Sequence, residues 1–258
     1  MIKVGIFGSE GRMRKDIFLR STHFKDIKIV YLCEHKGHKS IGSKRKDLTV
    51  GSDISQLIEL SDVIIDFSNA DATINLLKMV GNSKKKPSIV SGTTGFSKIQ
   101  EKKFANFSKG LRTLRSFNMS LGINLLKSLL SISAKNLIDL ADVEIFEIHH
   151  NKKKDIPSGT ALTLADSIKR GNHKIKNFSF REKSNNKVRA KNEIGFSSIR
   201  GGDVIGEHSV YFFLDGETIK FTHSAQDRKV FSDGALRASV WINNQKDGLY
   251  STIDMLDI

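Results

Sequence analysis

Short apolar segments recur along the first part of the chain, separated by stretches with helical spacing. Residues 3–7 form the first such segment, and Met13, Ile17 and Phe18 then follow on one side of a helix. Strands that alternate with helices are typical of a parallel sheet covered by helices. We therefore predict an α/β fold. The other predicted strands are residues 27–33, 48–52 (an edge strand), 62–68, 88–91 and 111–116, and the helices between them include 54–60 and 72–79.

The pattern changes after about residue 120. A long helical segment runs to about residue 140, and residues 143–148 then alternate apolar and polar side chains at the period of a half-buried strand. Alternation resumes over residues 204–221, which favours a mostly antiparallel sheet. Residues 172–192 are polar and indicate an exposed strand and loop. We expect the long helix to bury one apolar face in the core, formed by Leu125, Leu129, Ile132, Leu137 and Leu140.

A glycine turn follows the first predicted strand. Gly8 and Gly11 stand just before the first helix, where the backbone of a dinucleotide-binding fold approaches the cofactor pyrophosphate. The second predicted strand ends at Glu34, about the right distance from the turn for the acid that accepts hydrogen bonds from the adenosine ribose. The alternative is a solvated glutamate at a strand end.

Chemically reactive side chains are densest in residues 147–161. Two histidines, His149 and His150, close a predicted strand, and Lys153 follows in a loop with two further lysines. A reaction that needs a proton donor would find one in Lys153 or in a histidine. The simpler alternative is a turn with a solvated lysine run.

A predicted helix begins directly after this loop. Ser158 can cap the helix, which leaves the amides of Gly159 and Thr160 free at its N-terminus. Such a terminus attracts anions, and Gly159 has no side chain to block a close approach. A small substrate that carries carboxylates could therefore be held between the helix and the loop lysines.

Composition narrows the class of protein. The 258 residues are 38% hydrophobic and 27% charged, and no apolar run approaches the roughly 20 residues of a membrane helix. The chain starts directly in a predicted strand, without a signal sequence, so we expect a cytoplasmic protein. Cys33 is the only cysteine, which excludes an intramolecular disulfide and argues against a cysteine-built zinc site. We expect no metal.

The formal net charge of +14 makes nucleic acid the first partner to consider. The lysines are spread over short clusters at residues 44–46, 84–86 and 152–154, without the interleaved aromatic residues of a single-strand binding surface. A pyrophosphate cofactor and a dicarboxylate substrate would gain from the same positive field. We therefore expect no nucleic-acid partner.

The densest stretch also carries a family resemblance. Residues 147–161 resemble the pattern E-x-H-H-x-x-K-x-D-A-P-S-G-T-A of the 4-hydroxy-tetrahydrodipicolinate (dihydrodipicolinate) reductase family, with Ile156 in place of alanine. The first turn resembles G-x-x-G-R-M-G, with Arg14 in place of the last glycine. Four further segments match the family: D-F-S at 66–68, followed by Ala70 in place of proline; the turn at 92–96; the crossing segment 117–126; and R-x-G-D-x-x-G-E-H at 200–208. The resemblance therefore spans nearly the whole chain.

The resemblance implies a Rossmann-like dinucleotide-binding domain and a central α+β substrate domain with a mixed, mostly antiparallel sheet. The domains would be 1–120 with 229–258, including a last helix at 231–242, and 121–228. The implied activity is NAD(P)H-dependent reduction of 4-hydroxy-2,3,4,5-tetrahydrodipicolinate in the diaminopimelate route to lysine, by a homotetramer that associates through the central-domain sheet. Hydride chemistry belongs to the cofactor, so the protein supplies orientation, charge and a proton.

The resemblance also implies roles for particular residues. His149 and Lys153 would be the proton-donating pair, and His150, Gly159 and Thr160 would bind the substrate. His35 and Lys36 stand where many relatives have a basic residue that can contact a 2′-phosphate, so NADH and NADPH both stay open. The implied cofactor-binding residues are Gly8, Gly11, Arg12, Met13, Glu34, His35, Gly92, Thr93, Thr94, Phe117, Asn118 and Met119.

Two other classes of protein stay open at this point. Another oxidoreductase with a similar nucleotide domain would share the glycine turn and Glu34, but would have no reason for the histidine, lysine and Ser-Gly-Thr block. A non-catalytic dinucleotide- or nucleic-acid-binding relative would explain Arg14 and the basic charge. Such a relative would not need the proposed catalytic residues, all of which are present.

Overall fold

The computed structural model describes residues 1–175, 177–180 and 188–257, and the side chain of Arg12 lies outside this description. The chain forms two compact units. Unit one combines Met1–Leu121 with Lys229–Ile258, and unit two is Gly122–Arg228. No helix among the described residues combines the length and the apolarity needed to cross a membrane.

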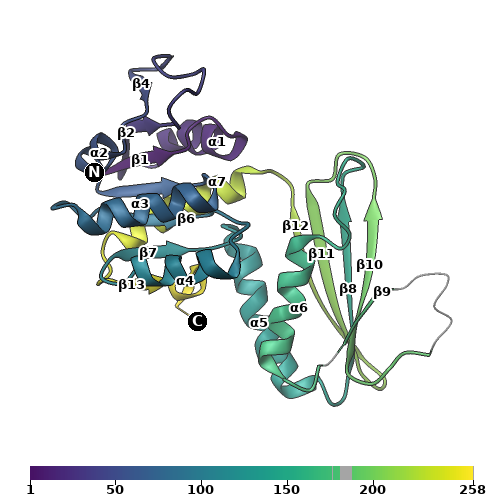
Figure 1. The fold of residues 1–258 in the computed structure, drawn as a ribbon. Helices are drawn as coiled ribbons and strands as arrows, with labels where there is room; N and C mark the ends of the chain where they lie inside the picture. Colours follow the sequence, from purple (N-terminus) through teal and green to yellow (C-terminus); the bar gives the residue numbers. More distant parts are fainter. Residues whose placement is uncertain (176, 181–187, 258) are drawn as a thin grey trace. The chain divides into compact units, whose positions relative to one another are not determined.

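Unit one is built on an eight-stranded sheet in the order β13-β7-β6-β5-β1-β2-β4-β3 (Figure 1). All neighbouring strands run parallel except β3 and β4, which are antiparallel. The chain runs outward from β1 to the β3–β4 edge, then returns to β5 on the other side of β1 and runs outward in the opposite direction, as in a doubly wound fold. The strands are β1 (Ile2–Phe7), β2 (Ile27–Cys33), β3 (Lys44–Arg45), β4 (Leu48–Gly51), β5 (Val63–Asp66), β6 (Ser88–Ser91), β7 (Arg112–Arg115) and β13 (Gly248–Tyr250).

Helices cover both faces of this sheet, because its strands bury side chains on both sides. Val4 and Ile6 of β1 pack in one cluster with Ile17 and Leu236, whereas Phe7 packs in the other with Leu57. Near-continuous apolar strands are what a sheet covered on both faces requires. The helices are α1 (Arg12–Arg20) and α7 (Lys229–Ile242) on one face, α2 (Ile54–Leu60), α3 (Ala70–Asn82) and α4 (Lys98–Phe107) on the other, and α8 (Thr252–Leu256) near the end of the chain.

Unit two is a five-stranded mixed sheet with helices on one face. The order is β12-β11-β8-β10-β9; β11 is antiparallel to β8 and β12, whereas β10 is parallel to β8 and β9. Leu130 and Leu164, from the two helices, pack with Ile145, Phe196 and Phe212 of the sheet. The elements are α5 (Leu121–Leu137), β8 (Asp142–His149), α6 (Gly159–Gly171), β9 (Asn177–Phe180), β10 (Glu193–Arg200), β11 (Gly206–Phe213) and β12 (Thr218–Ala225).

The predicted fold class is confirmed, but the predicted buried face of α5 is wrong. Leu125, Leu129 and Ile132 are 43%, 39% and 61% exposed, and Leu140 lies beyond the end of the helix at 68% exposure. Only Leu137 packs partly against the core. The helix carries a second apolar face at the same spacing, and this face packs in the core with residues of α6 and the sheet. Its residues are Ile123, Leu126, Leu130 and Ala134.

Five helices and strands were not predicted from the sequence: β3, α4, β10, β13 and α8. We predicted that strand 48–52 lies at the edge of the sheet. In the structure β3 pairs with β4, so the edge strand is Lys44–Arg45. Helix α4 begins with a capping box between Ser97 and Gln100, a signal that the sequence contains. Within the predicted exposed segment 172–192, β9 confirms the strand, while residues 176 and 181–187 lie outside the described residues.

Candidate active site

The glycine turn after β1 forms the base of a cavity in unit one. Gly8 has φ +74°, a left-handed backbone that favours glycine, and its amide donates to the carbonyl of Cys33 at 2.7 Å. Gly11 is the N-cap of α1 and has no side chain with which to cap the helix amides. Gly8 and Gly11 therefore present backbone without β-carbons at a helix N-terminus, which is the arrangement that binds phosphate groups.

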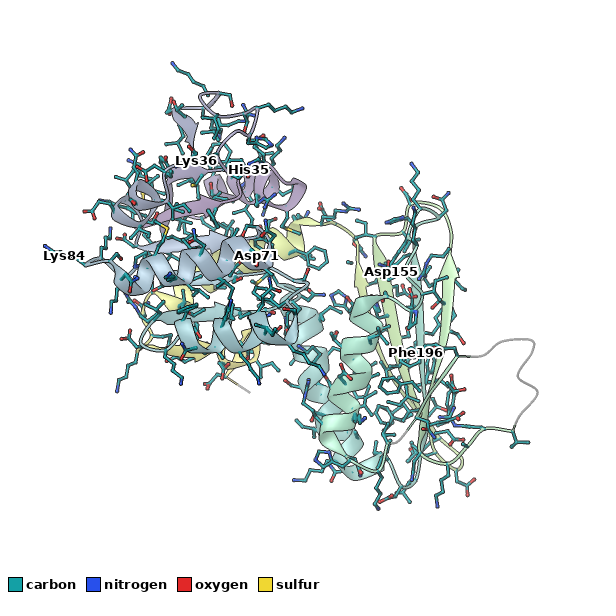
Figure 2. All side chains as sticks on the ribbon, viewed as in Figure 1. His35, Lys36, Asp71, Lys84, Asp155 and Phe196 are labelled. Atoms are coloured by element: carbon teal, nitrogen blue, oxygen red, sulfur yellow. The ribbon has the colours of Figure 1, made fainter. Side chains whose placement is uncertain are left out.

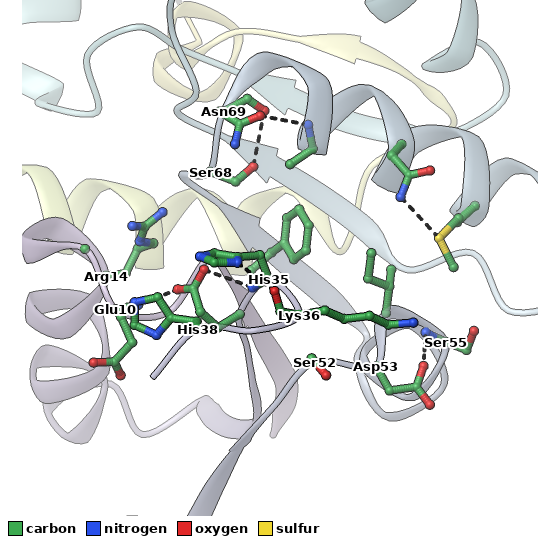
Figure 3. A pocket seen from close by; sticks show the side chains of 18 residues that line it. Glu10, Arg14, His35, Lys36, His38, Ser52, Asp53, Ser55, Ser68 and Asn69 are labelled. Carbon is green, nitrogen blue, oxygen red and sulfur yellow. Dashed lines mark hydrogen bonds between the residues drawn. The ribbon is translucent and has the colours of Figure 1, made fainter. Parts of the chain in front are cut away.

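Glu34 closes one side of this cavity, directly after β2. The residue is 8% exposed, and its carboxylate accepts hydrogen bonds from the amides of Glu10 (3.1 Å) and His35 (3.0 Å). The cavity has a volume of about 1050 Å³ and is also lined by Lys36 and Asp53 (Figure 3). A carboxylate held in this way beside a glycine turn can accept from a ribose hydroxyl. Figure 2 shows His35 and Lys36 beside each other at the end of β2.

A smaller hollow of about 350 Å³ lies beyond the glycine turn in the same unit. Met13, Gly92, Thr93 and Thr94 line it. The ring of Phe67 lies against Gly92, where a Cβ would be only 2.6 Å from ring atom Cζ, so this position has no room for a side chain. The predicted turn after β6 therefore lies at a hollow beside the glycine turn.

The buried carboxylate of Asp66 holds the loops around this hollow together. It accepts hydrogen bonds from the hydroxyls of Ser68 (2.5 Å), Thr73 (2.5 Å), Ser91 (3.0 Å) and Thr93 (3.1 Å). Four side chains from three segments are thereby fixed by one fully buried group. Rigid loops at the carboxyl ends of parallel strands are where open α/β sheets bind ligands.

Three residues of the predicted crossing segment line neither cavity. Phe117 is 58% exposed and lies beside the Arg115 guanidinium, 4.8 Å from the ring centroid. The Asn118 side chain accepts from the amide of Ser120. Met119 is 2% exposed and packs in the core of unit one. Cofactor contacts by Phe117, Asn118 and Met119 therefore stay predictions, as does any contact by the Arg12 side chain.

These residues fit a dinucleotide. Gly8 and Gly11 have no side chains at the N-terminus of α1, and Glu34 is placed for a ribose. Arg14 also faces the turn, with a buried Nε that has no hydrogen-bond partner among the described residues. The guanidinium of Arg14 therefore has an N–H donor to spare, and an oxygen of a bound pyrophosphate could accept from it.

The reactive stretch of the sequence forms a second site, in unit two. His149 ends β8, and its Nδ1 lies 2.5 Å from Oε2 of Glu147, a fully buried residue. Arg200, which lies opposite His149 in the sheet register, holds the same carboxylate with both terminal nitrogens at 2.7 and 2.8 Å. The amide of Ser158 adds a donor at 3.3 Å. His149 is thus held by a carboxylate that is itself fixed from two sides.

This arrangement determines the charge of each group. Burial alone would raise the pKa of Glu147, but hydrogen bonds from Arg200, Ser198 and His149 outweigh it and lower the pKa to about 2. Burial lowers the pKa of His149, against the opposing effect of Glu147, and Lys153 and Arg200 lower it further. His149 is therefore neutral near pH 7. Because the carboxylate is ionised, we place the imidazole proton on Nδ1, which leaves a lone pair on Nε2.

Lys153 differs from the other lysines of its loop. Lys152 and Lys154 are exposed, whereas the Lys153 side chain is 20% exposed and its Nζ lies 2.8 Å from both carboxylate oxygens of Asp155. That ammonium lowers the pKa of Asp155, and a hydrogen bond from the Gly159 amide contributes less. Asp155, labelled in Figure 2, therefore occupies the ammonium of Lys153 in the loop before α6.

The helix after the loop begins as predicted. Ser158 caps α6, its hydroxyl accepting from the amide of Ala161 at 3.1 Å, and Thr160 follows Gly159 in the first turn. The Ser158 hydroxyl also lies 2.8 Å from Nε2 of His208. Burial, followed by repulsion from His149 in its protonated form, lowers the pKa of His208 to about 3, so this histidine is neutral near pH 7. Gly159 and Thr160 thus form the first turn of α6, and in the loop before it the His150 carbonyl accepts from the amide of Lys153 at 3.1 Å.

Sequence reasoning missed three residues of this site: Glu147, Arg200 and His208. All three belong to the motifs on which the family resemblance rests. The sequence motifs alone gave no reason to expect that these side chains contact one another. Arg200 is 53 positions away from Glu147 along the chain, and the sheet register brings the two together. An ionisable residue at an inward position of an alternating strand, such as Glu147 in β8, is the signal that could have found them.

Unit one has a glycine turn that fits a dinucleotide, and unit two has a buried histidine and a lysine beside a helix N-terminus. These features are those of a nicotinamide-dinucleotide-dependent oxidoreductase. The comparisons with known proteins agree. The chain matches the family models "Dihydrodipicolinate reductase, N-terminus" over residues 2–119 and "Dihydrodipicolinate reductase, C-terminus" over residues 122–256. The chain belongs to the dihydrodipicolinate reductase family, which confirms the predicted family and the predicted oxidoreductase.

Relatives and solved structures match over the full length. The 4-hydroxy-tetrahydrodipicolinate reductase of Pelagibacter ubique is 40% identical over 99% of this chain and 98% of its own, and that of Helicobacter hepaticus is 42% identical over 100% of both. A dipicolinate-bound dihydrodipicolinate reductase from Paenisporosarcina has the same fold, with a TM-score of 0.80, 22% identity and 97% of each chain covered.

Proposed function

We propose that this chain reduces 4-hydroxy-2,3,4,5-tetrahydrodipicolinate to 2,3,4,5-tetrahydrodipicolinate in the diaminopimelate route to lysine. The reaction takes up a hydride and a proton and releases water. The observation that carries the proposal is the grouping of neutral His149, the Lys153 ammonium and the N-terminus of α6 in a family whose curated relatives bear this activity as their name. When bound, the nicotinamide dinucleotide supplies the hydride.

The substrate carboxylates would meet donors that an internal carboxylate now uses. Lys153 donates to both carboxylate oxygens of Asp155, whose side chain is 57% exposed and able to move away. A substrate carboxylate that displaced Asp155 would gain the same ammonium and the same helix N-terminus. Thr160 adds a hydroxyl in the first turn, and His150 lies at the start of the loop.

The proton would come first from Lys153. A lysine ammonium has three donor hydrogens, whereas neutral His149 with its proton on Nδ1 presents a lone pair at Nε2. His149 would therefore accept from Lys153 and position it, and the buried pair of Glu147 with Arg200 would hold the imidazole in this tautomer. The sequence predicted His149 and Lys153 as a proton-donating pair. We now propose that Lys153 donates the proton and that His149 positions Lys153.

Either NADH or NADPH would serve as cofactor. Glu34 suits the unphosphorylated ribose of NADH, whereas His35 and Lys36 line the same cavity and suit the 2′-phosphate of NADPH. We propose use of both, with a modest preference for NADH. The proposal also keeps the cytoplasmic location expected from the sequence.

We further propose a homotetramer that associates through the outer face of the sheet in unit two. Helices cover only the inner face, so alternate residues of β11 point away from the core. Tyr211 and Phe213 stack on this outer face with ring centroids 5.4 Å apart, and Phe213 is 43% exposed. An aromatic surface on an uncovered sheet favours association with further copies.

The test of the function is a coupled assay. Purified protein is mixed with NADH or NADPH and with substrate made freshly from pyruvate and aspartate semialdehyde, and loss of the reduced nicotinamide absorbance is followed. We expect oxidation only when both precursors and their condensing enzyme are present. Oxidation that needs only aspartate semialdehyde would indicate a different oxidoreductase, and no oxidation with either cofactor would refute the proposal.

A further inference from the structure

Arg14 occupies the place at which the dinucleotide would cross the glycine turn. It stands where the family pattern has glycine, and its guanidinium lies directly over the turn. A Cβ added to Gly8 would lie 2.5 Å from Nη1 of Arg14, and one added to Gly11 would lie 2.6 Å from its Cζ. The absent side chains of both glycines therefore make room for this guanidinium.

The guanidinium is only partly satisfied. Nη1 donates to the backbone carbonyl of Phe67, a neutral acceptor, and Nε is buried without a hydrogen-bond partner in the described part of the chain. Burial lowers the pKa of Arg14, although the carboxylates of Glu34, Asp66 and Glu10 oppose this shift. None of these carboxylates forms an ion pair with Arg14 among the described residues. Burying a cation without a counterion raises the free energy of the folded protein. An anion bound beside the guanidinium would offset this unfavourable free energy.

Arg14 also lies at the boundary between two cavities. It lines the 1050 Å³ cavity that holds Glu34 (Figure 3). It also lines the 350 Å³ hollow formed by the turn at Gly92. The residues shared by both linings are Gly11, Arg14, Ser68 and Asn69. A dinucleotide has two nucleosides joined by a pyrophosphate. A molecule with its adenosine near Glu34 and its nicotinamide near Gly92 must pass its pyrophosphate between these four residues.

We propose that Arg14 is a ligand of the cofactor pyrophosphate, and that its guanidinium exchanges the Phe67 carbonyl for phosphate oxygens when the dinucleotide binds. The inference rests on the proposed function, since it requires a dinucleotide in this cavity. It adds a side-chain ligand at a position where the family pattern has none. NADH, NADPH and ADP-ribose share the pyrophosphate, so Arg14 would contribute equally to the binding of all three.

Two other roles for Arg14 make different predictions. A guanidinium that binds the 2′-phosphate would contribute to NADPH affinity and leave NADH and ADP-ribose unchanged. A guanidinium that merely blocks the turn would weaken all three ligands, so its removal would strengthen binding.

The experiment measures dissociation constants of NADH, NADPH and ADP-ribose by isothermal titration calorimetry, without substrate or turnover. The variants are Arg14→Met, Arg14→Lys and the matched control Arg237→Met. Arg237 is an exposed arginine of α7 in the same unit that lines neither cavity, so its variant reports the loss of one positive charge alone. Thermal unfolding checks that each variant is folded.

We expect Arg14→Met to weaken all three ligands by similar factors of at least about tenfold, the loss of one charge-assisted hydrogen-bond pair. Arg237→Met should stay within about twofold of wild type. Should Arg14→Met not fold, at least about threefold weaker binding by Arg14→Lys supports the inference, because lysine cannot form the planar two-donor contact. Unchanged or tighter binding, or a loss confined to NADPH, overturns it. Wild-type protein that binds none of the three ligands would instead overturn the proposed function.

Discussion

Nδ1 of His149 lies 2.5 Å from Oε2 of Glu147, and the Glu147 carboxylate is fully buried. Arg200 binds the same carboxylate through two nitrogens, so a buried ion pair holds the imidazole of His149. Removing one member of a buried pair leaves the other charge uncompensated. The stability of unit two and the tautomer of His149 should therefore depend on the same carboxylate.

Glu147→Gln should lower stability and change its dependence on pH. The pKa of Glu147 is about 2 in the folded chain against an ordinary value of 4.5, so ionisation favours the folded state. Its contribution is fully present above pH 4.5 and is lost as the pH falls toward 2. We expect the variant to lose about 3 to 5 kcal/mol at neutral pH, since Arg200 is left unpaired, and to lose this acid dependence.

Urea unfolding between neutral and acidic pH measures both effects. Glu144→Gln is the control, because Glu144 pairs with Arg189 on the other face of the same strand, and its loss should cost about 1 kcal/mol or less. An unchanged acid slope in Glu147→Gln would contradict the described role of the carboxylate.

Thr160→Val should weaken substrate binding by roughly 1 to 3 kcal/mol, because a methyl group replaces a hydroxyl donor at the start of α6. Pyridine-2,6-dicarboxylate, a planar mimic with both carboxylates, should compete with the substrate and lose affinity by the same factor. Thr163→Val is the control: its hydroxyl donates to the carbonyl of Thr160 one turn further on, away from the helix terminus. Equal inhibition of all three proteins would remove Thr160 from the site.

Glu34→Gln should move cofactor preference toward NADPH. The Glu34 carboxylate lines the adenosine side of the cavity, where it can accept from a 2′-hydroxyl and repels a 2′-phosphate. The wild-type preference for NADH should be less than about tenfold, or about 1.4 kcal/mol, because Lys36 offers only a point charge. The ratio of kcat/KM for the two cofactors measures it, with the exposed Glu59→Gln as control. An unchanged ratio would show that Glu34 does not touch the ribose.

Phe213→Glu should break the proposed tetramer, because a charge would lie on the aromatic outer face of the sheet in unit two. Light scattering after size-exclusion chromatography should show a smaller species than wild type. Leu249→Glu, which changes a 51% exposed residue of unit one, should leave the mass unchanged. A wild-type protein that elutes as a monomer would contradict the proposed assembly.

The alternation of apolar strands and helices predicted the architecture of unit one because buried parallel strands must be almost wholly apolar. Strand β2 and helix α2 have the predicted bounds. The edge elements were missed for the opposite reason: β3 has two residues and β13 has three, and neither is long enough to show a period. On α5, two apolar faces share one spacing, so the pattern could not decide between Leu129 and Leu130.

The candidate site was predictable as a set of reactive residues but not as an arrangement. The density of histidines, lysines and a helix start in residues 147–161 pointed to a site. The buried pair of Glu147 with Arg200 depends on the register of β10 against β8, which no local pattern contains. The contact of Asp155 with Lys153 likewise depends on the fold of the loop.

The most direct test of the central claim is the turnover of Lys153→Ala and His149→Ala, measured beside NADH affinity. Lys154→Ala, an exposed neighbour in the same loop, is the matched control. Each of the two site variants should lower kcat by about a hundredfold or more, as loss of a positioned proton donor or of its partner does, while the dissociation constant for NADH stays within about twofold of wild type. Near-normal turnover of both variants would contradict the claim that this site supplies the proton.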